Sequence, residues 1–583
     1  MKKIILAALL SIIAWHLAMA VPAKPWIRTV TQPNGTTLQV MLAGDEWHHS
    51  YLTADGYTIA KAADGNFYYK TTAGITNVLA HDIAVRNAQE AAFIAANKEQ
   101  LSLASQFTDE KRQARAKAHG LAVPKGSQIP HINSPRIPVL LLNYKDKQFK
   151  DDDPVSVWQQ QLAGTEGTTM YKYFYDQSFG KFTPQFDIYG PFDLSENRVE
   201  YGGNKGNGQD KGVGKMVAEG CLGLDSVINF SQYDNDGDAV CDVVIVVYAG
   251  DGEASSYDED CDNAVWPCQW NLASSDYGQN LSLDGVLVSK FAVFNELYGS
   301  DLTMIDGIGT MCHEFSHCLG LPDFYDTNYA NHYGMGSWSL LCRGCYNNDG
   351  FTPCGYTSYE RTFMGWFEPS TPVSDSTYTI QSVAAGGEAF MITSDNPNEY
   401  YLIENIQQTE WNEYAAASGL MVTHVNYNWS WWNYNMVNNY NTQGMTIIPA
   451  DGTLKMYQRG SYYFNDLTDE PGDLYPYDGN DELTSTSTPA ATLYNSSENL
   501  DKPITGITRN DDGTVTFSYM KEPTPEPVSG DVNRDGYVTS ADVTAIYDYL
   551  LNGDETFLDT SDVNGDGYIT SADVTAIYDL LLN

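Results

Sequence analysis

Four residues within a short central stretch constrain this chain more than any other feature. They are His313, Glu314, His317 and Asp323, with Gly320 between the last two. If residues 304–319 are helical, His313 and His317 project from one face and reach a single zinc ion. Glu314 then lies beside the open coordination position, where it can take a proton from a metal-bound water. A left-handed Gly320 would reverse the chain and return Asp323 as a third ligand, in a metzincin-like arrangement.

The alternative is that these residues form the exposed face of an amphipathic helix. A bare HExxH pentapeptide arises by chance, so the pattern alone does not decide between the two. The added Gly320 and Asp323 favour the metal site. Two histidines and a glutamate between Cys312 and Cys318 also make a poor solvated face.

The first twenty residues read as a secretory signal peptide. Lys2 and Lys3 precede an apolar run that ends near Leu17, and residues 18–20 form an A-x-A cleavage site. A membrane anchor is the alternative, but the run is short for a bilayer span. No other stretch is a candidate span, so we expect a secreted, extracellular or surface-associated protein with no membrane span in the mature chain. The first cysteine is Cys221, which argues against a lipoprotein.

Charge and cysteine content narrow the classes of partner. The chain has 32 basic and 75 acidic side chains and a formal charge of -43, which excludes nucleic acid as a partner and suits a protein that binds calcium outside the cell.

In an exported protein the clustered cysteines predict disulfides, with at least one thiol left over. Cys342 and Cys345 have the spacing of a zinc knuckle, but no second pair accompanies them. The nine cysteines are at positions 221, 241, 261, 268, 312, 318, 342, 345 and 354.

The chain is too long for one hydrophobic core, and composition changes along it predict several domains. Hairpin turns between residues 31 and 72 and a helical connector over 87–119 indicate an N-terminal module, with a basic cluster at Lys111, Arg112, Arg115 and Lys117. We interpret this module as a propeptide; a permanent N-terminal domain is the alternative. The expected order is signal peptide 1–20, propeptide 21–134, catalytic domain 135–370 with buried strands at 139–142 and 243–248, β-rich domain 371–520, Pro-rich linker 521–528 and terminal domain 529–583.

The run from His313 to Asp326, HEFSHCLGLPDFYD, resembles the immune inhibitor A-like (M6) metallopeptidases. Residues 174–180 and 400–405 add weaker similarity, and the resemblance spans roughly residues 137–520. It implies a zinc endopeptidase made as a precursor, with His313, His317 and Asp323 matching the zinc ligands and Glu314 the general base. The chain departs from the family at Leu341, where a methionine usually forms an apolar floor under the metal. Leucine would serve there, and Met335 is a second candidate to fill the space.

Latency of such a precursor needs a blocking group other than a cysteine, because no cysteine precedes Cys221. Asp45, Glu46, His48 and His49 form a polar cluster that is a candidate to cap the metal. A solvated hairpin turn is the favoured interpretation of this cluster.

Two parts of the chain carry calcium-type patterns. Asp234, Asp236, Asp238 and Asp242 alternate around Gly237 and predict a structural calcium site, with an acidic surface turn as the alternative. The terminal segment is a duplication, since Asp531–Asn552 and Asp562–Asn583 differ only at 534/565, 538/569 and 549/580. Its expected calcium ligands are Asp531, Asn533, Asp535 and Asp542 in the first loop, with Gly536 at the turn, and Asp562, Asn564, Asp566 and Asp573 in the second, with Gly567.

Helices are expected over residues 543–551 and 574–582, but no helix precedes the first loop, unlike an EF-hand. The pair resembles a type I dockerin, which implies a calcium-folded module that docks on a cohesin-type partner. Ser540-Ala541 and Ser571-Ala572 match the positions that the family uses for recognition. A purely structural calcium-stabilised tail is the alternative.

We therefore expect a multidomain chain: an α/β, metzincin-like zinc peptidase domain, a β-rich domain and a small α-helical, calcium-binding dockerin-like domain. The expected function is secreted zinc-dependent hydrolysis of protein or peptide substrates. The same modules also fit a non-catalytic adhesive or scaffold-associated binding protein. A carbohydrate-active enzyme is a third possibility, but no pair of carboxylates stands out for it. Trp429, Trp431 and Trp432 would then bind sugar faces, although such aromatics more often pack within a β-domain.

Overall fold

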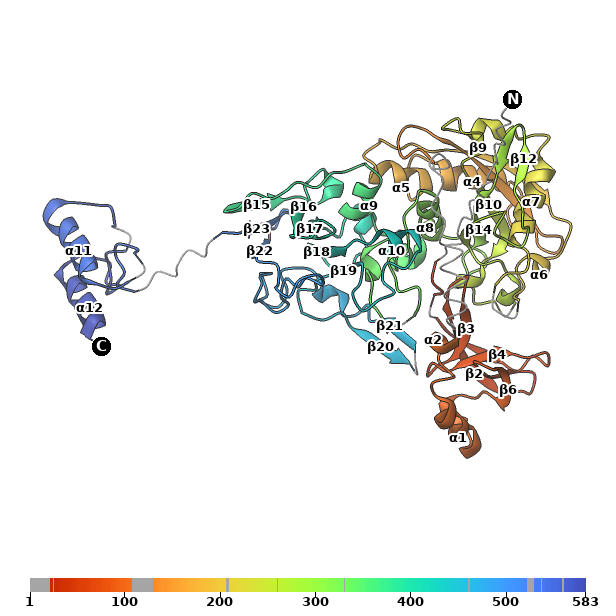
Figure 1. Ribbon diagram of the computed structural model, residues 1–583, viewed down its shortest axis with the longest axis horizontal. Coiled ribbons are helices and arrows are strands. Elements are labelled where there is room, and N and C mark those ends of the chain that lie inside the picture. Colours follow the sequence, from red (N-terminus) through yellow and green to blue (C-terminus); the bar gives the residue numbers. More distant parts are fainter. Residues whose placement is uncertain are drawn as a thin grey trace, which may run out of the picture. The chain divides into compact units, whose positions relative to one another are not determined.

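The computed structural model divides into two compact units, the first ending at Tyr519 and the second beginning at Met520 (Figure 1). The predicted signal peptide, the basic cluster at 111–117, residues 522–528 of the predicted linker and Gly536 lie outside the described residues. The described residues are 21–24, 26–106, 129–205, 209–258, 260–329, 331–459, 462–521, 529–535, 537–557 and 560–582.

The N-terminal module is a six-stranded antiparallel sheet in which neighbours in sequence pair in space. Gly35 and Gly65 have positive φ values of 85° and 80° at two of its turns, a conformation that glycine adopts without strain. This confirms the hairpin-rich prediction. The strands are β1 (Ile27–Thr31), β2 (Thr37–Gly44), β3 (His49–Thr53), β4 (Thr58–Lys61), β5 (Phe67–Thr71) and β6 (Gly74–Leu79); the helices that follow are α1 (Ala88–Asn97) and α2 (Leu103–Gln106).

The centre of the first unit is a five-stranded sheet in the order β11-β14-β10-β7-β8. Four strands are parallel and β11 is antiparallel to β14. β10 and β14 are buried along their whole lengths, as expected for strands covered on both faces. The strands are β7 (Arg136–Asn143), β8 (Gln185–Asp193), β10 (Val244–Asp251), β11 (Cys268–Asn271) and β14 (Lys290–Leu297); a small sheet of β9 (Val240–Cys241), β12 (Leu281–Leu283) and β13 (Val286–Val288) accompanies them.

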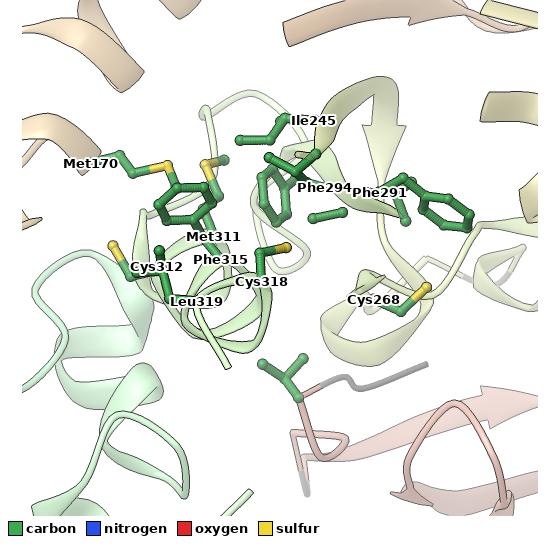
Figure 2. Close-up of a cluster of buried hydrophobic side chains, with 14 of the residues drawn as sticks. Met170, Ile245, Cys268, Phe291, Phe294, Met311, Cys312, Phe315, Cys318 and Leu319 are labelled. Atoms are coloured by element: carbon green, nitrogen blue, oxygen red, sulfur yellow. The ribbon is translucent and has the colours of Figure 1, made fainter. Parts of the chain in front are cut away.

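Helices around this sheet complete an α/β arrangement. Helix α8 (Gly309–Cys318) contributes Met311 and Phe315 to an apolar cluster that also contains Ile245 of β10 and Phe294 of β14 (Figure 2). The opposite face of α8 is thereby fixed relative to the sheet. The other helices are α4 (Pro154–Ala163), α5 (Met170–Gln177), α6 (Arg198–Tyr201), α7 (Val213–Leu224) and α9 (Ser358–Phe363).

Strands dominate the region from residue 376 to residue 519, which confirms the β-rich prediction. Several of its buried residues, among them Leu402, Met421 and Ile447, join the same core as the central sheet. One direct link is Ser358 at the start of α9, whose backbone N–H donates to Glu404 Oε1 of β17 at 2.8 Å. The elements are β15 (Ser376–Ile380), β16 (Phe390–Thr393), β17 (Glu399–Ile406), β18 (Gly419–Asn426), α10 (Trp429–Asn433), β19 (Met445–Ile447), β20 (Met456–Arg459), β21 (Tyr462–Asn465), β22 (Ile504–Arg509) and β23 (Val515–Tyr519).

Short 3₁₀ helices occupy several connections of the first unit. They are η1 (Ile83–Val85), η2 (Phe230–Tyr233), η3 (Glu253–Ser255), η4 (Cys261–Asn263), η5 (Gly336–Trp338), η6 (Gly344–Gly350), η7 (Val383–Ala385), η8 (Glu410–Asn412) and η9 (Glu470–Gly472). Two of them, η3 and η6, lie next to the candidate active site described below.

The second unit holds the duplicated segment as two helices, α11 (Ser540–Asn552) and α12 (Ser571–Leu582). Both begin three residues earlier than predicted. For α11 the reason is a capping box, in which the Thr539 side chain and the Asp542 carboxylate satisfy backbone N–H groups at the first turn. Val543 and Ile546 of α11 pack with Val574 and Ile577 of α12 in a small core. Among the described residues, no helix is long and apolar enough to cross a membrane.

The prediction of disulfides is wrong for this structure. All nine cysteines lie in the described residues, and each is a free, buried thiol. Eight of them serve as small apolar groups of the main core, as Figure 2 shows for Cys312 and Cys318. Cys261 instead accepts a hydrogen bond from Arg28 Nη1 at 3.1 Å. Burial raises the pKa of the Cys221 and Cys318 thiols to about 12, which keeps both protonated at neutral pH.

Candidate active site

Helix α8 carries the central motif, but it begins at Gly309 rather than at residue 304 as predicted. The preceding residues pair with the end of β14 instead: Ile305 bridges Leu297, and Asp306 N–H donates to Glu296 O. Gly309 itself is required by crowding, since a Cβ there would lie 1.9 Å from Cys345 O. Backbone pairing with the end of β14 therefore overrides the helical pattern at the start of the segment.

The structure brings His313, His317 and Asp323 together. Gly320 follows the helix with φ of 102°, and the chain reverses there. Asp323 Oδ1 consequently lies 3.2 Å from His313 Nε2 and 3.3 Å from His317 Nε2. The ligand atoms of the three residues all lie within 4.8 Å of one another, and all three side chains are buried.

Hydrogen bonds determine which ring nitrogens face the centre of this cluster. His313 Nδ1 lies 2.7 Å from Leu340 O, and His317 Nδ1 lies 2.8 Å from Leu321 O. A carbonyl only accepts hydrogen bonds, so both Nδ1 atoms carry the proton. In the neutral rings each Nε2 then presents a lone pair, and the two Nε2 atoms are only 2.9 Å apart.

Asp323 Oδ1 faces the same point and has no hydrogen-bond donor. Two imidazole lone pairs and a carboxylate oxygen therefore converge in a buried space with no proton between them. This donor set fits Zn²⁺, which binds His nitrogen and Asp oxygen and leaves a further position open in catalytic sites.

The pKa shifts of His313 and Asp323 also favour the protonation states that bind a metal. Burial lowers the pKa of His313, and a charge on His317 lowers it further, so the neutral ligand form is favoured. Burial alone would raise the pKa of Asp323, but His317 and His313 outweigh it and hold that pKa well below its usual range. A deprotonated aspartate beside neutral imidazole is the form that a metal requires.

Asn435, just after α10, is a site residue that the sequence did not reveal. Its Nδ2 donates to Asp323 Oδ2 at 2.6 Å, and its Oδ1 accepts from Asp323 N–H at 2.6 Å. Asn435 has φ of 50°, a left-handed conformation that asparagine tolerates better than most residues. The β-rich region thus orients the aspartate of the cluster, and only the unusual backbone preference of Asn hints at this in the sequence.

Glu314 lies next to the cluster and is fully buried. Burial raises the pKa of its carboxyl well above the usual range, and the charges of Glu46 and Asp323 raise it further. Its Oε1 accepts a hydrogen bond from Val21 N–H at 2.8 Å, whereas Oε2 has no hydrogen-bond partner. The glutamate is therefore in contact with the N-terminal segment of the same chain.

That segment runs along the site in an extended path. Trp266 Nε1 donates to Val21 O at 3.2 Å, and the Tyr346 hydroxyl donates to Pro22 O at 2.7 Å. Lys24 N–H donates to Ala254 O at 3.0 Å. Residues 21–24 thus occupy the space in front of Glu314.

The polar cluster at residues 45–49 is buried, which corrects its interpretation as a solvated turn. His49 Nδ1 lies 2.9 Å from Asp45 O and its Nε2 lies 3.4 Å from Glu253 Oε1. His48 Nε2 lies 3.2 Å from Leu103 O. Both histidines thus have partners within the protein, and the charge of Glu46 in the same buried cluster acts on Glu314.

Leu341 and Met335, the two candidates for the apolar floor, are both fully buried. They flank the residue after Asp323: Phe324 N–H donates to Leu341 O at 2.7 Å, and Met335 N–H donates to Phe324 O at 3.2 Å. The floor segment therefore supports the backbone of Asp323, and Leu340 beside it orients His313.

Among the described residues, a second group of potential ligands comprises Asp234, Asp236 and Asp238. Asp234 accepts hydrogen bonds from the backbone N–H groups of Gly237, Asp238 and Ala239, which closes the loop. The predicted fourth member, Asp242, lies apart from this group. It is buried and accepts from Asn235 Nδ2 at 2.8 Å, and burial raises its pKa to about 7.

The two C-terminal loops fold in the same way around their aspartates. In the first, Asp535 N–H donates to Asp531 Oδ1 and to Asn533 Oδ1, and Asn533 N–H donates to Asp542 Oδ1. In the second, Asp566 N–H donates to Asp562 Oδ1 and to Asn564 Oδ1, and Asn564 N–H donates to Asp573 Oδ1. The repeat in sequence is therefore a repeat in structure.

Comparison with known proteins gives two matches of domain size. Residues 139–366 match the family model of the immune inhibitor A peptidase M6 catalytic domain, and residues 529–582 match that of the dockerin type I domain. Immune inhibitor A of Bacillus thuringiensis subsp. alesti is 24% identical over 243 residues, which cover 38% of this chain and 34% of that protein. Pre-pro-metalloprotease PrtV of Vibrio cholerae serotype O1 is 26% identical over 226 residues, or 34% of this chain and 24% of that protein. The matched segments thus span about a third or less of these relatives.

Proposed function

We propose that this chain, which contains an M6-type peptidase catalytic domain and a type I dockerin domain, is a secreted zinc-dependent endopeptidase. The main support for the proposal is that two imidazole lone pairs and a carboxylate oxygen that accepts no hydrogen bond converge beside a buried glutamate. Such a donor set suits catalytic zinc, and its placement at the end of a helix and a reversed chain is metzincin-like. Protein or peptide chains are the expected substrates.

His313, His317 and Asp323 would hold the metal in this proposal. Zinc bound there would acidify a water molecule and polarise the scissile carbonyl. Leu340 O and Leu321 O fix the histidine rings, and Asn435 fixes the aspartate. These outer partners keep each ligand in the orientation that metal binding needs.

Glu314 is the group placed to move protons. Burial raises the pKa of its carboxyl, which increases its affinity for a proton. A carboxylate placed there can accept a proton from the attacking water and return it to the leaving amine. The position of the leaving amine is marked by Val21 N, which lies 2.8 Å from Glu314 Oε1.

We further propose that residues 21–134 are a propeptide and that the intact chain is latent. Val21 is the first residue after the predicted signal cleavage, and residues 21–24 fill the path a substrate would take. A substrate cannot reach Glu314 until this segment leaves. No cysteine is needed for this block.

The C-terminal unit supports a docking role. Its two loops, each with Asp and Asn side chains folded inward, would bind calcium in the pattern expected from the sequence. With calcium bound, this unit would attach the peptidase to a cohesin-type protein.

The non-catalytic alternative and the carbohydrate-active alternative gain less support. The three candidate ligands lie together, and Glu314 of the same helix contacts the N-terminal segment as a general base would contact a substrate. Of the three tryptophans considered for sugar binding, Trp432 is buried against Phe324 and Tyr359, and Trp431 stacks on Tyr440. Trp429 alone of the three is largely exposed.

The test compares wild-type protein with Glu314→Gln, both freed of the N-terminal segment, using a peptide library with and without a chelator. We expect cleavage by the wild type to stop in chelator and cleavage by Glu314→Gln to fall by about 100-fold or more, because general acid–base catalysis contributes about 10²–10⁴-fold. Glu166→Gln, on an exposed residue, is the matched control and should keep wild-type activity. Chelator-insensitive cleavage, or full activity of Glu314→Gln, would refute the proposal.

A further inference from the structure

Lys24 is a nearly buried lysine, and its surroundings are those of a binding pocket. Its side chain is 7% exposed, although lysine is rarely buried without a partner. Its Nζ donates to Asp349 O at 2.8 Å. It also lies 5.2 Å from the ring centroid of Tyr298 and 4.9 Å from that of Tyr346.

The pocket belongs to the peptidase domain and is built to face a positive charge. Aromatic faces are negative at their centres and attract an ammonium group within about 6 Å. The charge of the buried Asp306 carboxylate acts on Lys24, and this carboxylate is fixed by hydrogen bonds from Asn295 Nδ2 at 2.7 Å and from Gly307 N–H at 2.8 Å. Burial raises the pKa of Asp306, and the charge of Lys24 lowers it, so the two groups interact.

The carbonyl of Asp349, which accepts from Lys24 Nζ, lies in a left-handed segment of the backbone. Asn348 and Asp349 have positive φ values of 48° and 57°, a pair of left-handed residues without glycine. Such conformations cost free energy and cluster at binding sites. Phe351, which follows, packs edge-on against Tyr298 with ring centroids 5.1 Å apart.

The position of Lys24 along the N-terminal segment indicates which residue of a substrate the pocket would bind. Glu314 must lie beside the nitrogen of the scissile bond in order to protonate the leaving amine. Val21 N occupies that place, so Val21 corresponds to the first residue after the scissile bond and Lys24 to the fourth. Trp266, Tyr346 and Ala254 hold the intervening backbone through contacts that any peptide could make.

We propose that Tyr298, Tyr346, Asp306 and the Asp349 carbonyl form a specificity subsite for a basic side chain, Lys or Arg, at the fourth residue after the scissile bond of a protein substrate. We call it the Lys24 pocket. The inference rests on the proposed peptidase function. When the N-terminal segment leaves, the pocket retains a buried carboxylate, two aromatic faces and a carbonyl, with a cation no longer present to neutralise them.

The experiment uses the zinc-bound protein secreted and matured by a producing cell, with its N-terminus determined by sequencing. Peptide substrates differ only at the fourth residue after the cleaved bond: Lys, its neutral analogue norleucine, or Glu. We expect kcat/KM to be about 10-fold higher for Lys than for norleucine, the size of a desolvated cation–π contact with a hydrogen bond, and lowest for Glu. Equal kcat/KM for all three peptides would overturn the proposal.

Two variants assign the preference to the pocket. In Asp306→Asn and in Tyr298→Leu, kcat/KM for the Lys peptide should become about equal to kcat/KM for the norleucine peptide. Asp301→Asn, on an exposed residue of the same loop, should keep the wild-type ratio. Thermal melting of each variant checks that it is folded. If Asp306→Asn does not fold, Tyr298→Leu provides the test. A ratio that survives in a folded pocket variant would also overturn the proposal.

A binding measurement separates this inference from the proposed function. The hexapeptide of residues 21–26, Val-Pro-Ala-Lys-Pro-Trp, and its norleucine analogue are titrated into the matured protein by calorimetry. We expect the analogue to bind about 10-fold more weakly. Absence of cleavage of every peptide would refute the peptidase proposal, while equal binding of the two hexapeptides would refute the pocket.

Discussion

Two groups of potential metal ligands in this molecule have the same compactness and opposite surroundings. In both the His313-His317-Asp323 group and the Asp234-Asp236-Asp238 group, the ligand atoms lie within 4.8 Å of one another. The first group is buried and the second is largely exposed. Proximity of ligands is thus achieved in two different ways in one chain.

The difference lies in what positions the ligands. Partners of the buried group come from distant segments, with Leu340 27 residues from His313 and Asn435 112 residues from Asp323. Partners of the exposed group are backbone N–H groups of its own loop, at Gly237, Asp238 and Ala239. The first site exists only when the whole unit is folded, whereas the second is a property of a few consecutive residues.

Removal of a ligand from the buried group should have the largest effect. In His317→Ala we expect zinc affinity to fall by more than about 100-fold, because loss of even an outer partner of a ligand costs about 10–100-fold. Metal content after dialysis, measured by mass spectrometry, gives the result. Asp234→Ala is the matched control and should keep wild-type zinc content. Zinc retained at full stoichiometry by His317→Ala would contradict the assignment.

Asp473 tests what burial does to a carboxylate without a cation beside it. It is buried and accepts a hydrogen bond from Trp338 Nε1 at 2.7 Å. Burial raises its pKa to about 8, and the charge of Glu470 adds to the rise. The pKa of Asp323, which is equally buried but faces two histidines, is lowered instead. The sign of the shift therefore depends on the neighbours and not on burial alone.

The expected consequence is a pH dependence of stability. Because the folded state holds the Asp473 proton more tightly than the unfolded state, this group makes stability fall as pH rises from about 4 to about 8. Asp473→Asn removes that dependence, so its free energy of unfolding relative to wild type should rise by about 2–4 kcal/mol between pH 5 and pH 8. Denaturant melts across this range measure it, with exposed Asp511→Asn as the control. A pH-independent difference between variant and wild type would contradict the raised pKa.

Loss of Asn435 should have a smaller effect than loss of a ligand. Asn435→Ala frees Asp323 Oδ2 but leaves all three ligands in place, so zinc affinity should fall by about 10–100-fold. Competition with a metal indicator measures the affinity, and Asn441→Ala, on an exposed residue of the same loop, is the matched control. An affinity equal to wild type would mean that the β-rich region does not orient the aspartate.

The same contrast explains how far the sequence could predict the site. His313, Glu314 and His317 are related by helical spacing, and Gly320 marks the reversal that returns Asp323, so local rules were sufficient to bring them together. The α/β centre and the β-rich region were likewise predicted from apolar runs and turn residues. Asn435 was not, because its contact with Asp323 depends on packing between segments 112 residues apart.

Errors of the sequence-based predictions have the same origin. The start of α8 was placed too early because residues 304–306 pair with the end of β14 and the residue after it, and the helical pattern does not reveal this pairing. Asp242 was grouped with Asp234 by spacing; it accepts a hydrogen bond from Asn235, and its role as a calcium ligand stays a prediction. Disulfides were expected from cysteine number, whereas all nine thiols are free and buried.

The smallest effect is expected at the exposed group. If Asp234, Asp236 and Asp238 bind calcium with the weak affinity of extracellular sites, millimolar calcium stabilises the unit by only about 0.4–1.4 kcal/mol. Asp236→Asn should remove that increment in calcium and change nothing in its absence, since the side chain is exposed. Thermal melts with calcium or a calcium-selective chelator measure it. Asp562→Asn serves as the control, because its calcium effect should appear only in melting of the C-terminal unit. The zinc content of these variants should equal that of the wild type. A loss of stability in Asp236→Asn that does not depend on calcium would show that the loop aspartates have a structural role without the ion.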